Sequence, residues 1–380
     1  MNTLESKGRF DFHQRIPALD GLRGIAILAV FLRHYAGGLE KNANSTGTHL
    51  LGMLFNFGWT GVDLFFVLSG FLITGILFDT QEHPDYYKNF YARRILRIFP
   101  PYYLLASIYL VLTPVLAAHW KPGQLTFLVF FGYPLALIWP ALGEVSSSVH
   151  ITHLWSICAE EQFYMIWPWT IVKLRTANNI LRTCAILVIA TLLFRVAICM
   201  TGWVAIGWTH DFLGCRMDAL AVGAAIAMVM RGPLQSAALK WAPAVFVFTA
   251  ACVVILCLAR HTVDHGDPVI ATIGFTLIAS MYGALLLLGL RQQGWVAKVF
   301  STPALRICGK YSYAMYLFDF PLTVFLSPQR TYFIAATHSY AVGSAVFLGF
   351  CLAANLLVAA TSYHLVEAPV LRLRRHFKYA

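Results

Sequence analysis

Charged residues are scarce in this sequence, and their scarcity excludes an ordinary soluble protein. They make up 12% of the 380 residues, whereas a soluble domain devotes about a quarter of its residues to charge. Acidic residues number only 17, against 28 basic ones. Hydrophobic residues reach 59%, and the mean hydropathy is +0.67. The composition therefore predicts a membrane protein.

Two other patterns are also missing. The sequence has no series of alternating ten-residue segments, the pattern typical of a transmembrane barrel, and no Cys-x-x-Cys pair. Its eight cysteines lie mostly within apolar runs, so we expect buried free thiols and neither a disulfide framework nor a metal site. No small-residue cleavage site follows the first apolar run, so we expect no cleavable signal peptide.

Long apolar runs are abundant. A run of about 20 residues can cross a bilayer core of about 30 Å, and in lipid its backbone must bond within the segment, so each run should be a helix. We identify runs at 19–36, 57–79, 100–118, 125–141, 154–173, 181–201, 213–230, 241–259, 269–290, 311–327 and 339–362. The run 125–141 contains Pro134 and Pro140 and could span, re-enter or lie at the interface. The expected fold is an all-α integral membrane protein with about ten transmembrane helices.

The net charge of +11 could indicate nucleic acid, but the positions of the basic residues favour another explanation. With ten spans and a cytoplasmic N-terminus, 20 of the 28 Lys and Arg fall on cytoplasmic segments, as the positive-inside rule requires. We expect no nucleic-acid partner, a location in the cytoplasmic (inner) membrane and both termini in the cytoplasm. One membrane domain is predicted over 19–369, with a cytoplasmic segment 1–18, a basic tail 370–380 and no appended soluble domain.

The first span carries two ionisable residues on one face. Arg23 and His34 are eleven residues apart, which is three helical turns and a rise of about 16 Å. Ionisable groups inside a membrane are costly and indicate function. Each residue alone has a structural explanation, because an arginine near a helix end can snorkel and a histidine can mark a boundary. Their shared face favours a ligand that touches both.

A second group of polar residues begins the run 154–173. His153 and Glu160 are seven residues apart and share a helix face. Glu160 and Glu161 are adjacent carboxylates that cannot both stay charged cheaply in lipid, so one could carry a raised pKa and transfer protons. The alternative is a hydrogen bond that joins neighbouring spans.

Charged residues also occur near other span ends. Asp63, Arg216 and Asp218 fall toward the outer side and could pair with other buried charges, whereas Asp319 is isolated within its span and needs a partner. On the cytoplasmic side, arginine is the preferred side chain for phosphate, and a cluster of arginines could bind a phosphorylated ligand or only set topology. That cluster is Arg93, Arg94 and Arg97, followed by Tyr102.

Together these residues fit two classes of function. One is the transfer of a group from a cytosolic phosphorylated donor toward the far side of the membrane. The other is a proton-coupled glycan or lipid transporter without acyl transfer.

The ordered motifs of this chain resemble the acyltransferase-3 family of membrane acyltransferases, along nearly its whole length. The matching segments are Leu19-Asp-Gly-Leu-Arg23-Gly with His34, Gly61-Val-Asp63 through Ser69-Gly70, Arg93-Arg-Ile-Leu-Arg97 through Tyr102, His153-Leu-Trp-Ser156 through Glu160-Glu161-Gln-Phe-Tyr164, Arg216-Met-Asp218, and Tyr363 through Pro369. The sequence departs from the family at Asp319, where other members usually carry a histidine.

The resemblance implies a ten-helix acyltransferase domain that uses cytosolic acyl-CoA, usually acetyl-CoA, as a co-substrate with no bound cofactor. The acceptor would be a hydroxyl of a surface or secreted glycan, free or lipid-linked, with membrane lipids as the other partner and the oligomeric state open. Supporting roles would fall to Asp63, Ser69, His153, Tyr164, Arg216 and Asp218.

A mechanism follows as a hypothesis. The donor's phosphates would meet Arg23, Arg93, Arg94, Arg97 and Tyr102. The thioester would then lie near His34, acting as general base or as nucleophile. Glu160 or Glu161 would orient this histidine or shuttle its proton.

Overall fold

The computed structural model describes residues 16–37, 46–115, 125–131, 152–203, 205–291 and 294–378, and within these ranges the chain forms helices and turns with no strand. The longer helices are α1 (Pro17–Ala36), α2 (Thr46–Asn56), α3 (Gly61–Thr80), α4 (Tyr86–Val115), α7 (Trp155–Leu174), α8 (Ala177–Thr201), α10 (Met217–Val229), α11 (Gln235–Arg260), α12 (Phe275–Leu290), α14 (Pro303–Leu326) and α16 (Tyr340–Ser362). Shorter pieces connect them: η2 (Phe57–Thr60), η3 (Thr126–Val129), η5 (Thr152–Leu154), α9 (Trp208–Asp211), η6 (Leu213–Cys215), η7 (Ile270–Gly274), α13 (Trp295–Phe300), η8 (Ser327–Gln329), α15 (Arg330–Thr337), η9 (Tyr363–Glu367), α17 (Ala368–Leu371) and η10 (Arg372–His376). The expected all-helical fold is confirmed for these ranges.

The chain is a multi-pass membrane protein, although not every predicted span is apolar enough to be identified as one. Within the described ranges, five helical segments are long and apolar enough to cross a bilayer: 49–80, 177–201, 235–260, 270–290 and 340–376. Helices α1, α4, α7, α10 and α14 coincide with the other predicted spans, so the number ten stays a prediction. Of the run 125–141, only 125–131 is described, and it contains the short turn η3.

The predicted spans that fail this test do so for physical reasons. Helix α10 has only 13 residues, about 20 Å at the helical rise. Helix α1 carries Asp20, Arg23 and Arg33, and α7 carries Glu160 and Glu161. The helices with the candidate site residues therefore include the least apolar ones.

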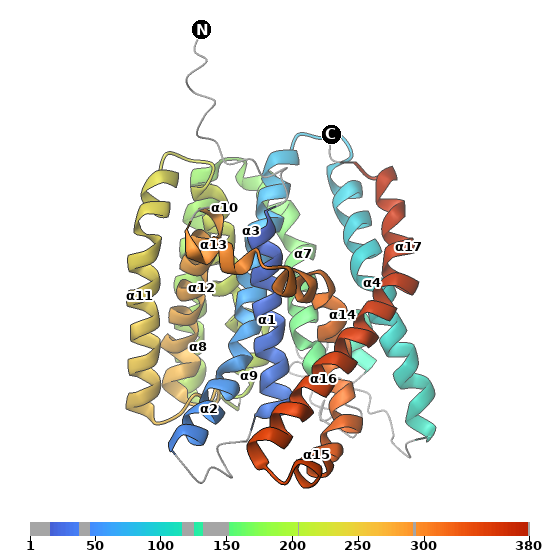
Figure 1. The fold of residues 1–380 in the computed structure, drawn as a ribbon. Helices are drawn as coiled ribbons and strands as arrows, with labels where there is room; N and C mark the ends of the chain where they lie inside the picture. Colours follow the sequence, from blue (N-terminus) through green and yellow to red (C-terminus); the bar gives the residue numbers. More distant parts are fainter. Residues whose placement is uncertain are drawn as a thin grey trace.

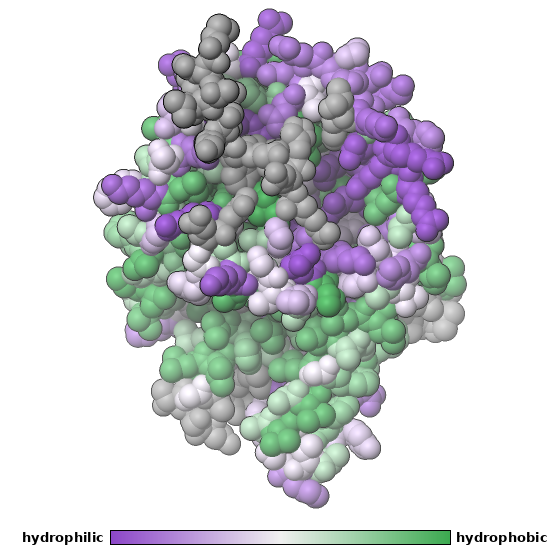
Figure 2. All heavy atoms as spheres, turned by 45° about the horizontal axis from the view of Figure 1, so that its top comes forward, coloured by the Kyte–Doolittle hydropathy of each residue, from purple (hydrophilic) through white to green (hydrophobic). Residues whose placement is uncertain are grey.

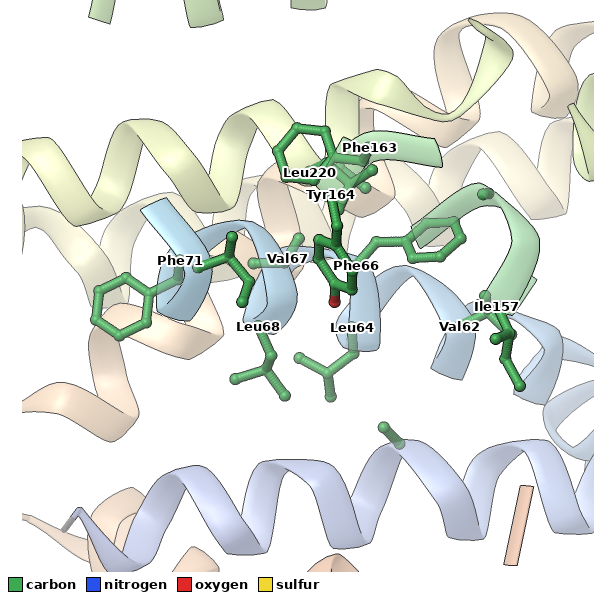
Figure 3. Close-up of a cluster of buried hydrophobic side chains, with 14 of the residues drawn as sticks. Val62, Leu64, Phe66, Val67, Leu68, Phe71, Ile157, Phe163, Tyr164 and Leu220 are labelled. Carbon is green, nitrogen blue, oxygen red and sulfur yellow. The ribbon is translucent and has the colours of Figure 1, made fainter. Parts of the chain in front are cut away.

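Helix α3 lies at the centre of the packing and is apolar on nearly every side. Its buried residues point in opposite directions: Leu64 and Leu68 toward one neighbour, and Phe66 toward α7 (Figure 3). Phe163 and Tyr164 of α7 and Leu220 of α10 complete the cluster (Figure 3). A helix that is hydrophobic all round is a buried helix, so α3 forms the core around which the other helices pack.

Glycine allows the closest helix contact that matters for the site, between α1 and α14. A Cβ at Gly24 would lie 2.1 Å from the Leu305 carbonyl oxygen, and one at Gly309 would lie 1.7 Å from the Asp20 carbonyl oxygen. Small residues let transmembrane helices approach to backbone contact. The pairing of α1 with α14 is therefore specified by glycine on both helices.

The bundle has two ends with different contents. At one, the terminal end, α1 and α4 begin and the chain ends: the Arg93 guanidinium donates to the Phe377 carbonyl oxygen at 2.9 Å. At the other, the far end, lie α2, α9 and α15 (Figure 1). Hydrophilic residues gather over the terminal end, and the flank below them is mainly hydrophobic (Figure 2). This distribution fits a protein embedded in a bilayer along its middle.

Candidate active site

A cavity of about 100 Å³ opens between α1, α3, α4 and α7 near the terminal end. We call it the arginine cavity, because Arg23, Arg94 and Arg97 line it. Its walls are mostly apolar side chains of α3, which include Phe65, Phe66, Leu68, Leu72 and Ile73. The cavity combines a cationic group of side chains with an apolar passage.

Cations outnumber anions around the arginine cavity. Glu160 is its one lining carboxylate among the described residues, and Arg23 lies 3.9 Å from Asp20. The Arg94 guanidinium lies over the Tyr164 ring, 5.1 Å from its centroid, and the Tyr164 and Ser69 hydroxyls are hydrogen-bonded. The excess of guanidinium groups suits an anionic ligand, because arginine binds phosphate in bidentate fashion.

A second cavity, of about 420 Å³, lies toward the far end. We call it the histidine cavity, because four imidazoles line it: His34, His153, His210 and His265. Three aromatic rings line it as well: Trp59, Trp155 and Phe320. Val62 and Tyr316 line both this cavity and the arginine cavity. The two cavities therefore adjoin inside the bundle.

His34 is held by a carboxylate on another helix. Its Nδ1 lies 2.6 Å from Oδ2 of Asp319, which is fully buried on α14. The Asn355 side chain, from α16, donates to the other carboxylate oxygen of Asp319 at 2.5 Å. Because an ionised carboxylate can only accept, Nδ1 of His34 donates and Nε2 carries the lone pair. This arrangement prepares Nε2 to accept a proton or attack a carbonyl carbon.

Tyr316 is fixed at the junction of the two cavities. Its hydroxyl donates to the His153 carbonyl oxygen at 2.7 Å and lies 2.6 Å from the Ser156 hydroxyl. The His153 ring nitrogen Nε2 lies 3.1 Å from the Leu317 carbonyl oxygen, to which it donates. The rings of His34 and His153 both contact Phe320, with centroids 5.1 and 5.4 Å apart respectively. Helices α7 and α14 are thus locked together beside His34.

The order of these features matches a known family. Residues 16–363 match a family model described as an acyltransferase domain. The chain belongs to this acyltransferase family. The resemblance to the acyltransferase-3 family is confirmed.

Relatives of this acyltransferase-family chain are proteins named for O-acetylation. A Bacillus subtilis protein provisionally named peptidoglycan O-acetyltransferase YrhL is 28% identical over 94% of this chain and 55% of its own length. The peptidoglycan O-acetyltransferase OatA of Listeria monocytogenes is 24% identical over 93% of this chain and 56% of its own length. The chain thus spans somewhat more than half the length of these relatives. No solved structure matches it.

The structure brings most of the predicted site residues of the acyltransferase domain to the two cavities. Arg23, Arg94, Arg97, Ser69, Glu160 and Tyr164 line the arginine cavity. His34 and His153 line the histidine cavity. Segments separated widely in sequence therefore meet in two adjoining groups.

The predicted carboxylates are not beside His34, which corrects the sequence-based hypothesis. Glu160 faces the arginine cavity, and the contact that orients His34 comes from Asp319. Glu161 is buried and lines neither cavity, because consecutive helical residues point about 100° apart. Seven residues separate Glu160 from His153, about 10 Å along a helix, and that distance leads from one cavity to the other.

Arg93 and Tyr102 also lie elsewhere than predicted for donor binding. Arg93 is bonded to the Phe377 carbonyl oxygen, and the fully buried Tyr102 hydroxyl donates to the Phe127 carbonyl oxygen at 2.6 Å. Neither lines the arginine cavity. Arg93 shares α4 with Arg94 and Arg97 but points toward the C-terminal segment.

Asp63, Arg216 and Asp218 belong to buried ion pairs, as the sequence allowed. Arg216 pairs with Asp63, and Arg195 pairs with Asp218 at 2.8 Å. Arg195 also donates to the Cys215 and Thr272 carbonyl oxygens. These contacts join α3, α8, α10 and η7. Breaking such a pair leaves an uncompensated buried charge, so the motif Arg216-Met-Asp218 holds the bundle together.

The sequence alone did not identify Asn355, Tyr316 or the partner of Asp319. Asp319 gave a signal, because a buried charge needs a partner, but not the identity of that partner. Asn355 and Tyr316 resemble many other polar residues in apolar helices and gave no distinguishing signal.

Proposed function

We propose that this chain is a membrane O-acyltransferase that moves an acetyl group from cytosolic acetyl-CoA to a hydroxyl of a surface glycan. The observation that carries the proposal is the junction at Val62 and Tyr316. On one side of this junction lie three arginines, and on the other lies the hydrogen-bonded pair of His34 and Asp319. A donor bound among the arginines would present its thioester to the histidine.

The donor-binding step follows from the chemistry of the arginine cavity. Arg23, Arg94 and Arg97 would bind the phosphates of acetyl-CoA through charge-assisted hydrogen bonds. The apolar wall of α3 would take the pantetheine arm. The basic residues expected on cytoplasmic segments favour a cytosolic terminal end, where the donor is available, and hence the cytoplasmic membrane as location.

The transfer step uses Nε2 of His34 as general base. The acceptor hydroxyl loses its proton to Nε2 and attacks the thioester carbonyl, so that the new C–O bond forms as the C–S bond breaks. The imidazolium, stabilised by Asp319, then returns the proton to the CoA thiolate. A two-step variant passes the acetyl group through Nε2 as an acyl-imidazole. Both routes need the tautomer that Asp319 selects.

The acceptor class is supported by the relatives. Two of them carry names that specify peptidoglycan O-acetylation. A sugar hydroxyl is also suited to the histidine cavity, which offers both aromatic faces and imidazole nitrogens. Peptidoglycan or another surface glycan is therefore the proposed acceptor.

The experiment uses inside-out and right-side-out membrane vesicles from cells that make the chain, supplied with acetyl-labelled acetyl-CoA. Label should enter the glycan fraction of inside-out vesicles and be lost with His34→Ala. Matched His376→Ala vesicles, altered at an exposed histidine at the terminal end, should label normally. Unchanged labelling with His34→Ala would overturn the mechanism, and labelling confined to right-side-out vesicles would overturn the orientation.

A proton-coupled glycan transporter is the second candidate, and the adjoining cavities favour it to the extent that they form a route lined by ionisable groups. It requires glycan movement driven by a proton gradient with no release of CoA. Measurement of CoA release by the purified chain in proteoliposomes separates the two, because transport alone leaves acetyl-CoA intact.

A further inference from the structure

The far end contains a third cavity beyond the histidine cavity. It measures about 390 Å³ and shares Arg33, Gly37, Trp59 and His265 with the histidine cavity. Its own lining includes polar side chains of α2 and of the segment after α11, such as Asn56 and His261. The two cavities therefore form one groove, with Arg33 at the boundary between them.

Arg33 is held in place at this boundary. Its Nη1 donates to the Asn56 side-chain oxygen at 2.7 Å, which ties α1 to the end of α2. The guanidinium also packs against Gly37, where a Cβ would lie 2.7 Å from Nη1. A side chain at position 37 would displace the guanidinium from the groove.

Arg33 differs from four other arginines in its partner. Arg195, Arg216, Arg231 and Arg260 each pair with an aspartate. Within the described ranges, no carboxylate forms an ion pair with Arg33, and its side-chain partner there is the neutral amide of Asn56. A partly buried guanidinium that bonds only to an amide retains most of its capacity for an anion, since it has five N–H donors.

The surrounding groups leave Arg33 as the permanent cation of the groove. Burial lowers the pKa of His265 to about 4, with His210 as a further cause, so His265 is neutral at pH 7. His210 donates to Asp211 at 2.7 Å, and the Asp264 carboxylate accepts from the Gly266 backbone amide. The two aspartates that line the groove thus have other contacts.

We propose that Arg33 binds an anionic group of the acceptor glycan, on or next to the sugar whose hydroxyl meets His34. The inference rests on the proposed function and narrows its acceptor to an acidic glycan. Arg33 and His34 are consecutive residues that both line the histidine cavity, so an anion and a reacting hydroxyl can be held together. The anion is a carboxylate of the sugar or a phosphate that links it to a lipid, because a guanidinium binds either one.

The experiment compares three disaccharide acceptors with the purified chain in proteoliposomes at saturating acetyl-CoA. The first is neutral N,N′-diacetylchitobiose, the second replaces one sugar by N-acetylmuramic acid, and the third is the chitobiose 1-phosphate. The wild type should show a kcat/KM at least tenfold higher for one of the charged acceptors, and which one identifies the source of the anion. In Arg33→Gln the ratio of charged to neutral acceptor should fall to near one, and Arg33→Lys should restore part of it.

Two variants separate charge recognition from structural damage. Asn56→Ala removes the hydrogen bond to Arg33 but keeps the cation, and should keep the preference. Arg330→Gln removes one positive charge from α15 at the same end without touching the groove, and should also keep it. Equal use of all three acceptors by the wild type, or a preference that survives Arg33→Gln, overturns the inference. Absence of any His34-dependent CoA release would instead overturn the proposed function.

Discussion

The arginine cavity and the groove at the far end are adjoining spaces built on different principles. The arginine cavity is narrow, with three guanidinium groups and walls that are mostly apolar. The groove is wider, with four histidines, aromatic rings and one cation, Arg33. The first suits a single invariant ligand with phosphates and a slender arm, whereas the second suits sugars of varied shape. The difference indicates that donor affinity and transfer chemistry are separable in this chain.

Asp319→Asn should produce the largest effect and confine it to the far side of the junction. The amide keeps the shape but removes the charge that selects the tautomer of His34 and stabilises its imidazolium. We expect kcat to fall roughly 10²-fold or more, with KM for acetyl-CoA within about twofold of the wild type. Steady-state kinetics with purified protein provide the measurement. A raised donor KM with unchanged kcat would show that the two regions are not separable.

Asp319→His is the companion variant, because it installs the residue usual in the family. Two imidazoles would then face each other without a carboxylate, so recovery of activity above the Asp319→Asn level would show that a neutral partner is sufficient. Activity equal to that of Asp319→Asn would assign the effect to the negative charge.

Arg94→Gln should act on the arginine cavity alone. Loss of a charge-assisted hydrogen bond of about 1.5–3 kcal/mol should raise KM for acetyl-CoA roughly tenfold or more while kcat stays nearly constant. The matched control is Arg93→Gln, which removes the same charge one residue away, where the side chain is bonded to the Phe377 carbonyl oxygen. Equal effects of both substitutions on KM would refute direct donor binding by Arg94.

Asn355→Ala should have the smallest effect and sharpen the comparison. The amide supports Asp319 from α16 at 2.5 Å but does not reach His34, so we expect kcat to fall by a factor of about 10. Donor KM should not change. A loss as large as that of Asp319→Asn would mean that Asn355 determines the position of the whole dyad, and a thermal unfolding curve would show whether the fold is affected.

The sequence by itself determined the membrane class, the order of the helices and most members of the two groups. Apolar runs predicted the helices, since backbone groups in lipid have no other partner. Ordered motifs identified the family and pointed to Arg23, Arg94, Arg97 and His34. These inferences succeeded because helical period and residue chemistry are local properties that a sequence displays directly.

Only the tertiary structure decided which side chains meet. Helical period showed that Arg23 and His34 share a face of α1, but not which helix lies opposite. The close contact of Gly24 and Gly309 brings α14 against α1, and His34 then meets Asp319, which is 285 residues away. The same packing directs Glu160 to the arginine cavity and Arg93 to the C-terminal segment. Adjacent residues on a helix point in different directions, and the environment of each depends on the neighbouring helices, which no local pattern specifies.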